Sequence, residues 1–186
     1  KISINDYTYN LPDDKIAVKP LAERDQSKLL IYKNGQIAQD IYKNISAHLP
    51  ENSLLIFNNT KVIQARILFK KDTGGVIEIF CLEPAEEQKD YGVVMNKTGQ
   101  VQWKCLIGGA SKWKSGNLTK TLTINNEEII FSAVLKEKIS DAYLAEFSWQ
   151  PAHFSFAEVI EKAGEIPLPP YIKRQSSLED KERYQT

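Results

Sequence analysis

The sequence contains few of the residues that build disulfide scaffolds and metal centres. Among its 186 residues there are two cysteines, two histidines and one methionine. Cys81 and Cys105 lie far apart and outside any CxxC pattern, which excludes a disulfide framework and a zinc ribbon. The shortage of histidine argues against a histidine-based metal site. We therefore expect no bound metal, and we interpret the cysteines and both histidines, His48 and His153, as structural.

The sequence also lacks an excess of charge of one sign and any long apolar run. Its 24 Lys and Arg balance 24 Asp and Glu, which excludes a nucleic-acid binder that depends on overall charge but leaves room for a local basic face. The longest apolar runs, such as 54–57, span only a few residues. The sequence therefore predicts no transmembrane helix and no signal peptide, and we expect a cytoplasmic monomer without a membrane partner.

Three consecutive stretches differ in their pattern, and we take them as the domain divisions. Residues 1–64 mix strands with short helices, residues 65–151 alternate as β-structure throughout, and residues 152–186 begin with a helix and end in a polar tail. In the middle stretch, Gly- and Asn-rich turns separate several short strands, which favours a closed barrel of about six strands. The strands expected there are 76–80, 101–106, 118–124, 128–135 and 142–147.

Local signals predict further elements on either side. Asn34-Gly35 separates the runs 28–33 and 36–41, and this pair predicts a two-residue hairpin because both residues tolerate a positive φ. The apolar run 53–58 predicts a strand buried on both faces, preceded by a short helix around 45–49.

The third stretch opens on a helix signal. Ser155 and Glu158 form a capping-box pattern, and Gly164 is expected to end that helix as its C′ residue. The following segment, 165–174, has three prolines in four positions, so it must be extended and stiff.

Two polar clusters lie next to expected strands. In 22–32, Arg24 can bind a carboxylate or phosphate while Asp25 orients it; the alternative is a surface turn with a local ion pair. In 57–67, the expected buried strand ends in Asn58 and Asn59, whose amides suit a base edge or a ribose. Lys61 and Arg66 in the same segment suit phosphate, and the alternative there is an Asx turn.

Two further segments have competing interpretations. The interval 91–126 carries five lysines and three large aromatics and no acidic residue, so it could face RNA through Lys112 and Lys114; alternatively its aromatics fill the barrel. Segment 165–174 and the end of the chain, 182–186, could line a pocket, and the alternatives are a linker or a polyproline ligand. The residues expected at that pocket are Tyr171, Arg174, Tyr184 and Gln185.

In this order, these segments resemble those of the S-adenosylmethionine:tRNA ribosyltransferase-isomerase family of queuosine biosynthesis. The similarity runs through AERDQSKLLIY (22–32), FNNTKVIQARI (57–67), GGVIEIF (74–80), EIPLPPYIKR (165–174) and ERYQT (182–186). One departure is Gln64, where the family usually has proline. Another is length, because family members continue well beyond Thr186 and carry histidine-containing and Gly-rich motifs there. The chain also starts at Lys1, without an initiator methionine, so we expect an incomplete chain.

The resemblance implies an α/β fold with an inserted six-stranded antiparallel β-barrel. Residues 65–151 would form the barrel, and residues 1–64 and 152–186 would belong to an α/β domain that continues beyond this chain and is incomplete in it. The resemblance also implies that Arg24, Asp25, Asn58, Asn59, Lys61 and Arg66, together with Tyr171, Arg174, Tyr184 and Gln185, contact substrate. The resemblance does not identify which residue acts as the catalytic base.

The implied reaction moves the ribosyl part of S-adenosylmethionine, a co-substrate, onto 7-aminomethyl-7-deazaguanine at the wobble position of tRNA. Adenine and methionine leave, and epoxyqueuosine forms. This chemistry needs a base, a neutral attacking amine and polar groups that stabilise the departing adenine; it needs no metal. Two alternatives stay open at this point: a non-enzymatic RNA-binding β-barrel module, and a protein-interaction module built on the proline segment.

Overall fold

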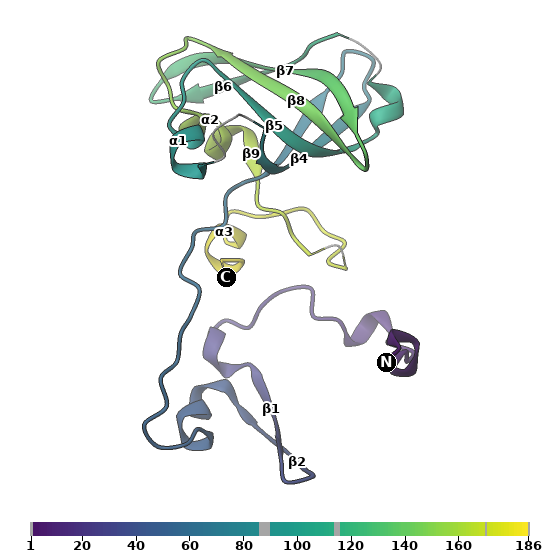
Figure 1. Cartoon of the computed structure of the whole chain (residues 1–186), viewed down its shortest axis with the longest axis vertical. Helices are drawn as coiled ribbons and strands as arrows, with labels where there is room; N and C mark the ends of the chain where they lie inside the picture. Colours follow the sequence, from purple (N-terminus) through teal and green to yellow (C-terminus); the bar gives the residue numbers. More distant parts are fainter. Residues whose placement is uncertain (1, 86–89, 114–115, 170, 186) are drawn as a thin grey trace. The chain divides into compact units, whose positions relative to one another are not determined.

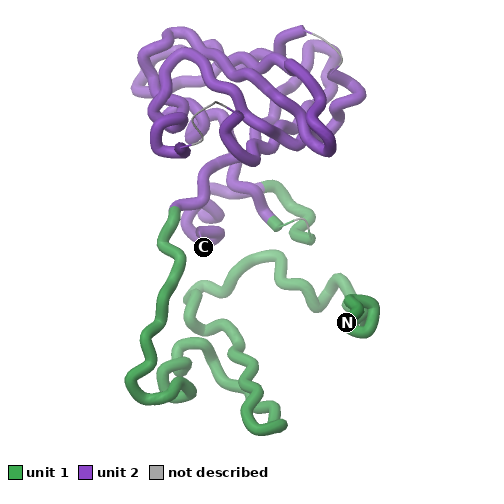
Figure 2. The backbone as a smooth tube through the Cα atoms, viewed as in Figure 1, with its two compact units in different colours: residues 1–60, 169–175 green, residues 61–168, 176–186 purple. Residues whose placement is uncertain are grey.

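The computed structural model describes residues 2–85, 90–113, 116–169 and 171–185. The chain divides into two compact units (Figure 2). Unit 1 consists of residues 1–60 and 169–175, and unit 2 consists of residues 61–168 and 176–186. The predicted divisions at 64/65 and 151/152 stay predictions.

Unit 1 contains the predicted hairpin. Strands β1 (Lys28–Lys33) and β2 (Gln36–Ile41) pair antiparallel. Asn34 and Gly35 join them with φ angles of 53° and 79°, as a turn with two positive φ angles requires. The rest of the regular structure described in unit 1 is short 3₁₀ helix: η1 (Ile4–Tyr7), η2 (Asp13–Lys15), η3 (Arg24–Gln26) and η4 (Tyr42–His48).

The strand expected at 53–58 does not form, and this prediction was wrong. The segment is irregular, and Leu54 and Ile56 are 85% and 88% exposed. A strand buried on both faces needs strand partners for its backbone and further elements packed over both of its faces. In the described part of unit 1, however, the two strands pair with each other. The helix expected around 45–49 is instead the longer 3₁₀ helix η4, which ends before Pro50.

Unit 2 is built on one antiparallel sheet that curls strongly (Figure 1). Its seven strands follow the order β6-β7-β8-β5-β4-β3-β9. Their bounds are β3 (Arg66–Lys70), β4 (Val76–Pro84), β5 (Gln100–Gly108), β6 (Leu118–Ile124), β7 (Glu127–Ile139), β8 (Ala142–Gln150) and β9 (Gly164–Glu165).

The five strands predicted in the middle stretch are all present, as β4 to β8. The sequence did not single out β3 or the two-residue β9 as strands, and the sheet differs from a closed six-stranded barrel. It curls until β6 packs against β3, but within the described residues these two strands have no ladder of hydrogen bonds. The assignment of the first and third stretches to an α/β domain stays a prediction.

Helix α2 (Phe156–Ala163) packs inside the curl of the sheet (Figure 1). The predicted capping box is present: the Ser155 hydroxyl accepts from the backbone N–H of Glu158, whose carboxylate accepts in turn from the backbone N–H of Ser155. Phe156 is fully buried, and its ring centroid lies 5.5 Å from that of Trp103 and 5.9 Å from that of Trp149. Burial of these aromatics fixes α2 against the sheet.

The remaining helices of unit 2 are short. They are α1 (Tyr91–Met95), the 3₁₀ helix η5 (Ala110–Lys112) and α3 (Asp180–Arg183). Cys81 on β4 and Cys105 on β5 face each other across the sheet, and both are buried free thiols. The neighbouring Cys105 thiol and, second, burial raise the pKa of Cys81 well above its usual value.

Helix α2 ends before Gly164, as the sequence predicts, but Gly164 is its C-cap and not its C′ residue. Its φ is −94°, and the chain passes directly from α2 into β9. Glycine is needed there for a different reason, because a Cβ at this position would collide with the backbone carbonyl oxygen of Gln64. The close approach brings residues 61–64 up to the end of α2.

Candidate functional site

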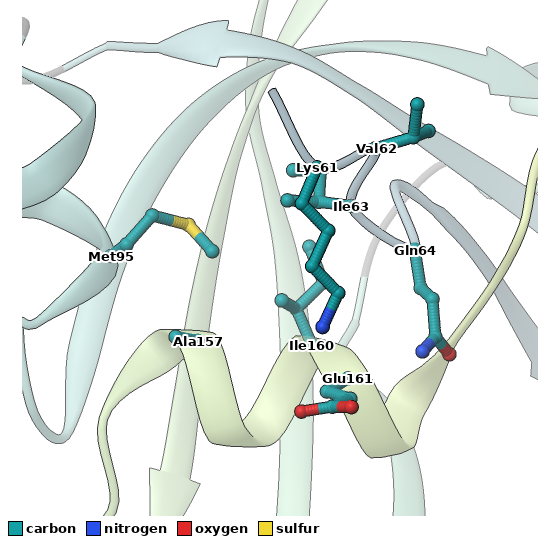
Figure 3. A pocket seen from close by; sticks show the side chains of 8 residues that line it. All are labelled: Lys61, Val62, Ile63, Gln64, Met95, Ala157, Ile160 and Glu161. Atoms are coloured by element: carbon teal, nitrogen blue, oxygen red, sulfur yellow. The ribbon is translucent and has the colours of Figure 1, made fainter. Parts of the chain in front are cut away.

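A cavity of about 170 Å³ lies within unit 2, between residues 61–64 and α2 (Figure 3). Its walls are mostly aliphatic, and its two charged residues, Lys61 and Glu161, are both exposed. In Figure 3 the side chain of Lys61 extends toward the part of α2 that carries Glu161. The lining residues are Lys61, Val62, Ile63, Gln64, Met95, Ala157, Ile160 and Glu161.

Three of these lining residues come from one helix face. Ala157, Ile160 and Glu161 have the i, i+3, i+4 spacing that places side chains on the same side of a helix. This spacing is visible in the sequence and could have placed Glu161 beside Ala157 and Ile160, but Glu161 was not among the predicted site residues. Met95, from the end of α1, was also missed, because nothing in the sequence brings α1 and α2 together.

Gln185 fixes the backbone that carries Lys61. Its side-chain oxygen accepts a hydrogen bond from the Val62 N–H at 2.7 Å, and its side-chain nitrogen donates to the Val62 carbonyl at 3.4 Å. The same nitrogen donates to the Lys181 carbonyl at 2.7 Å. Two of the predicted segments, 57–67 and 182–186, therefore meet at Val62. Tyr184, also predicted at the site, is half-buried beside Gln185.

A second cavity, of about 320 Å³, shares Gln64 and Glu161 with the first. Its other wall is formed by 176–178 and Lys181. Asp180 holds that wall in place: it is 2% exposed, and its carboxylate accepts from the Ser177 N–H at 2.6 Å and from the Ser177 hydroxyl at 3.0 Å.

Arg66, predicted to meet phosphate, is held by two carboxylates. Its guanidinium donates to Glu78 at 2.8 and 3.1 Å and lies 3.6 Å from Glu165. The hydrogen bond to Glu78 is the main cause that raises the pKa of Arg66. Nearby, the Lys120 ammonium donates to the Ala163 carbonyl at 3.0 Å, and burial lowers the pKa of Lys120. The contacts of Arg66 tie β3 to β4 and β9, and the Lys120 bond ties β6 to the end of α2.

The predicted residues of unit 1 fall into separate groups. Arg24 and Asp25 lie on η3 and, with Ser27 and Tyr42, line a cavity of about 410 Å³. Asn58 forms an Asx turn, in which its side-chain oxygen accepts from the Thr60 N–H at 3.0 Å and the Thr60 hydroxyl at 2.7 Å. The other predicted residues are Asn59, which is exposed and follows Asn58, Tyr171, which is 59% exposed, and the half-buried Arg174, which donates to the Val18 carbonyl at 2.8 Å.

The aromatic residues of the acid-free interval 91–126 are largely interior. Trp103 and Trp113 are 0% and 1% exposed, so they fill the curled sheet, as the alternative interpretation expects, and they are not available to stack on RNA bases. Tyr91, the third aromatic, is 50% exposed. Lys112 is exposed, and Lys71 donates a hydrogen bond of 2.6 Å to its backbone carbonyl. The other predicted RNA contact, Lys114, lies outside the described residues.

A hydrogen bond between two titratable side chains, Asp40 and His48, lies on the surface of unit 1. The Asp40 carboxylate lies 2.6 Å from His48 Nε2 and accepts from the Ile41 N–H at 2.7 Å and from the Asn44 side chain at 2.8 Å. The hydrogen bond with His48 is the largest cause that lowers the pKa of Asp40 to about 2. The pair ties η4 to β2.

Across the described ranges, no group of three or more His, Cys, Asp and Glu side chains is placed to hold a metal ion.

None of the helices in those ranges has both the length and the apolar composition needed to cross a membrane.

Comparison with known proteins gives a consistent result. The family model described as "Queuosine biosynthesis protein" matches residues 4–186. Curated relatives named S-adenosylmethionine:tRNA ribosyltransferase-isomerase include one from Geotalea uraniireducens, 35% identical over 100% of this chain and 49% of its own length. Others are from Fusobacterium nucleatum, 36% identical over 98% of this chain and 47% of the relative, and from Caldanaerobacter subterraneus, 32% identical over 98% and 48%. The chain thus spans about half the length of the curated relatives it matches. No solved structure matches it.

Proposed function

Because this chain belongs to the queuosine biosynthesis protein family, we propose that a protein carrying it acts as an S-adenosylmethionine:tRNA ribosyltransferase-isomerase. The observation that carries the proposal is the similarity to relatives of that name along the whole of this chain. The substrates would be S-adenosylmethionine and a tRNA whose wobble base is 7-aminomethyl-7-deazaguanine. The products would be epoxyqueuosine in tRNA, adenine and methionine.

The geometry of unit 2 supports this proposal at one point. The family-like segments 57–67 and 182–186 converge on Val62, where Gln185 fixes the backbone beside a cavity. Lys61 extends over that cavity and is the residue of this group that we expect to contact substrate. Arg66 is paired with two carboxylates, Glu78 and Glu165. We expect it to position segment 57–67 by holding strand β3 against its neighbouring strands.

The proposed reaction makes three chemical demands. A base must remove a proton acidified by the sulfonium, the attacking amine must be neutral, and polar groups must stabilise charge as adenine leaves. The wobble base must also leave its stack to reach the enzyme. Arg24, Asp25, Asn58 and Asn59, together with Tyr171, Arg174 and Tyr184, are proposed as substrate contacts. We assign none of them as the base, and a monomer in the cytoplasm stays a prediction.

We also propose that Lys112 and Lys114 contact the tRNA backbone. The Lys71 ammonium donates a hydrogen bond to the backbone carbonyl of Lys112, so a second lysine lies next to Lys112, and neighbouring lysines suit phosphate. Since the nearby tryptophans are interior, this contact would use charge without base stacking. Charge reversal at Lys112 and Lys114 should weaken tRNA binding and flatten its salt dependence. An unchanged salt slope would show that these lysines do not contact tRNA and only keep the outer face of the sheet charged.

The direct test is adenine release from S-adenosylmethionine in the presence of tRNA carrying the precursor base. A protein with this sequence at the relatives' full length should release adenine, whereas residues 1–186 alone should not. Asn59→Ala and Lys61→Ala should each lower turnover without unfolding the protein, as judged by circular dichroism. If the protein binds tRNA but releases no adenine under any condition, the alternative of a non-enzymatic RNA-binding module is favoured.

A further inference from the structure

We propose that the cavity between residues 61–64 and α2 binds the amino-acid end of S-adenosylmethionine, with Lys61 meeting its carboxylate and Glu161 its ammonium group. This inference rests on the proposed function, because it assigns one part of the same substrate to one part of unit 2. The whole cavity lies within that unit.

The first argument is the pattern of charge. Lys61 and Glu161 are the charged residues of the lining, and neither has an ion-pair partner within 4.0 Å among the residues that the structure describes. They extend from opposite walls toward the same space in Figure 3. A free α-amino acid group carries one charge of each sign on a single carbon. It can therefore bridge the two side chains in a way that neither a simple anion nor a simple cation can.

The second argument is the character of the walls. Apart from the two charged residues and Gln64, the lining is apolar, with Ile63, Ile160 and Met95 among its residues. Such a surface suits a flexible chain of methylene groups and sulfur, which is what joins the amino-acid group to the sulfonium in this substrate. An adenine ring is a poorer fit, because the lining contains no aromatic side chain for stacking. A phosphate is also a poorer fit, because Glu161 would repel it.

The third argument is that the site is built rigidly. Gln185 clamps both backbone groups of Val62, and the capping box with buried Phe156 fixes the start of α2. At the other end of α2, the close approach of Gly164 to the Gln64 carbonyl sets the spacing of the two walls. The backbone of both walls is therefore ordered before a ligand binds, which reduces the cost of ordering the site to that of the side chains alone.

The test uses the full-length protein with two ligands, S-adenosylmethionine and decarboxylated S-adenosylmethionine, which lacks only the carboxylate. Binding is measured by isothermal titration calorimetry. Lys61→Gln should weaken binding of S-adenosylmethionine about 10-fold, the value of one charge-assisted hydrogen bond, and that of the decarboxylated ligand less than about twofold. Glu161→Gln should weaken both ligands about fivefold, because both keep the ammonium group.

Matched controls come from strand β7, away from the cavity. Lys138→Gln and Glu128→Gln remove the same charges from exposed positions and should leave both affinities within about twofold of wild type. The proposal is overturned if Lys61→Gln weakens both ligands equally, or if neither cavity variant changes affinity.

Two outcomes separate this inference from the proposed function. If wild-type protein binds S-adenosylmethionine and releases adenine while both cavity variants bind it normally, the function stands and the assignment of this cavity is wrong. If wild-type protein binds neither ligand and releases no adenine, the proposed function fails, and the assignment fails with it.

Discussion

The hydrogen bonds between Gln185 and Val62 lead to a prediction that can be checked at a single amide. Replacing Gln185 with leucine keeps the approximate size of the side chain but removes the oxygen that lies 2.7 Å from the Val62 N–H. It also removes the nitrogen that donates to the carbonyls of Val62 and Lys181. We expect residues 61–63 to open locally more often, because the Val62 N–H then has no partner in the folded state.

The magnitude follows from the burial of the two groups. A buried polar group that loses its partner costs about 1–3 kcal/mol. Val62 and Gln185 are both half-buried, so water can replace part of the bond and we expect the lower end of that range. A local cost of about 1.4 kcal/mol corresponds to a tenfold fall in the protection of the Val62 amide against hydrogen exchange.

The assay is native-state hydrogen exchange followed by NMR. Gln185→Leu should lower protection at Val62 about 10-fold, whereas Gln185→Glu, which keeps an acceptor oxygen, should lower it by about threefold or less. Glu182→Ala, at an exposed position on α3, is the control and should leave protection unchanged. If Gln185→Leu exchanges like wild type, the side chain does not hold this segment and the reasoning is wrong.

Three further predictions concern stability and pH. Gly164→Ala should lower the free energy of unfolding by about 1–3 kcal/mol because its Cβ meets a backbone carbonyl, whereas Gly75→Ala, with open space around it, should stay within about 0.5 kcal/mol; equal effects in urea denaturation would refute this. The lowered pKa of Asp40 means that its contribution to stability is present above pH 3.8 and is lost as the pH falls through about 2. An NMR titration should therefore give a midpoint near 2 that rises toward 3.8 in His48→Ala, and a wild-type midpoint already at 3.8 would contradict the hydrogen bond. Arg66→Met should cost about 1–2 kcal/mol, a value discounted because the side chain is 31% exposed, and a change below about 0.3 kcal/mol would show that its ion pairs contribute nothing.

Much of the local structure could be predicted because its causes are local. Asn34-Gly35 gives a two-residue hairpin since both positions accept a positive φ, and the capping box at Ser155 needs only the residues up to Glu158. Strands β4 to β8 follow from alternation of apolar and polar residues. The same alternation could have placed Trp103 inside, because it shares a sheet face with buried Val101 and Cys105.

The errors arise where structure depends on distant partners. The apolar run 53–58 has the composition of a buried strand, but such a strand needs strand partners and elements packed over both faces. In the described part of unit 1 the two strands pair with each other, and Leu54 and Ile56 are exposed. The contact between Gln185 and Val62 spans 123 positions of sequence, so no local pattern could reveal it. Gly164 was predicted as the residue that ends α2, which it does as the C-cap. The reason that only glycine fits there is its close approach to the Gln64 carbonyl, which only the folded chain shows.

In the proposed function, the ribosyl part of S-adenosylmethionine, and not its methyl group, is transferred to tRNA. The most direct measurement uses S-adenosylmethionine labelled in its ribose carbons, the full-length protein and precursor tRNA, followed by mass spectrometry of the tRNA nucleosides. The account predicts that the labelled carbons appear in the modified wobble base, with adenine and methionine released in equal amounts. Unlabelled tRNA with S-adenosylhomocysteine as the product would contradict it.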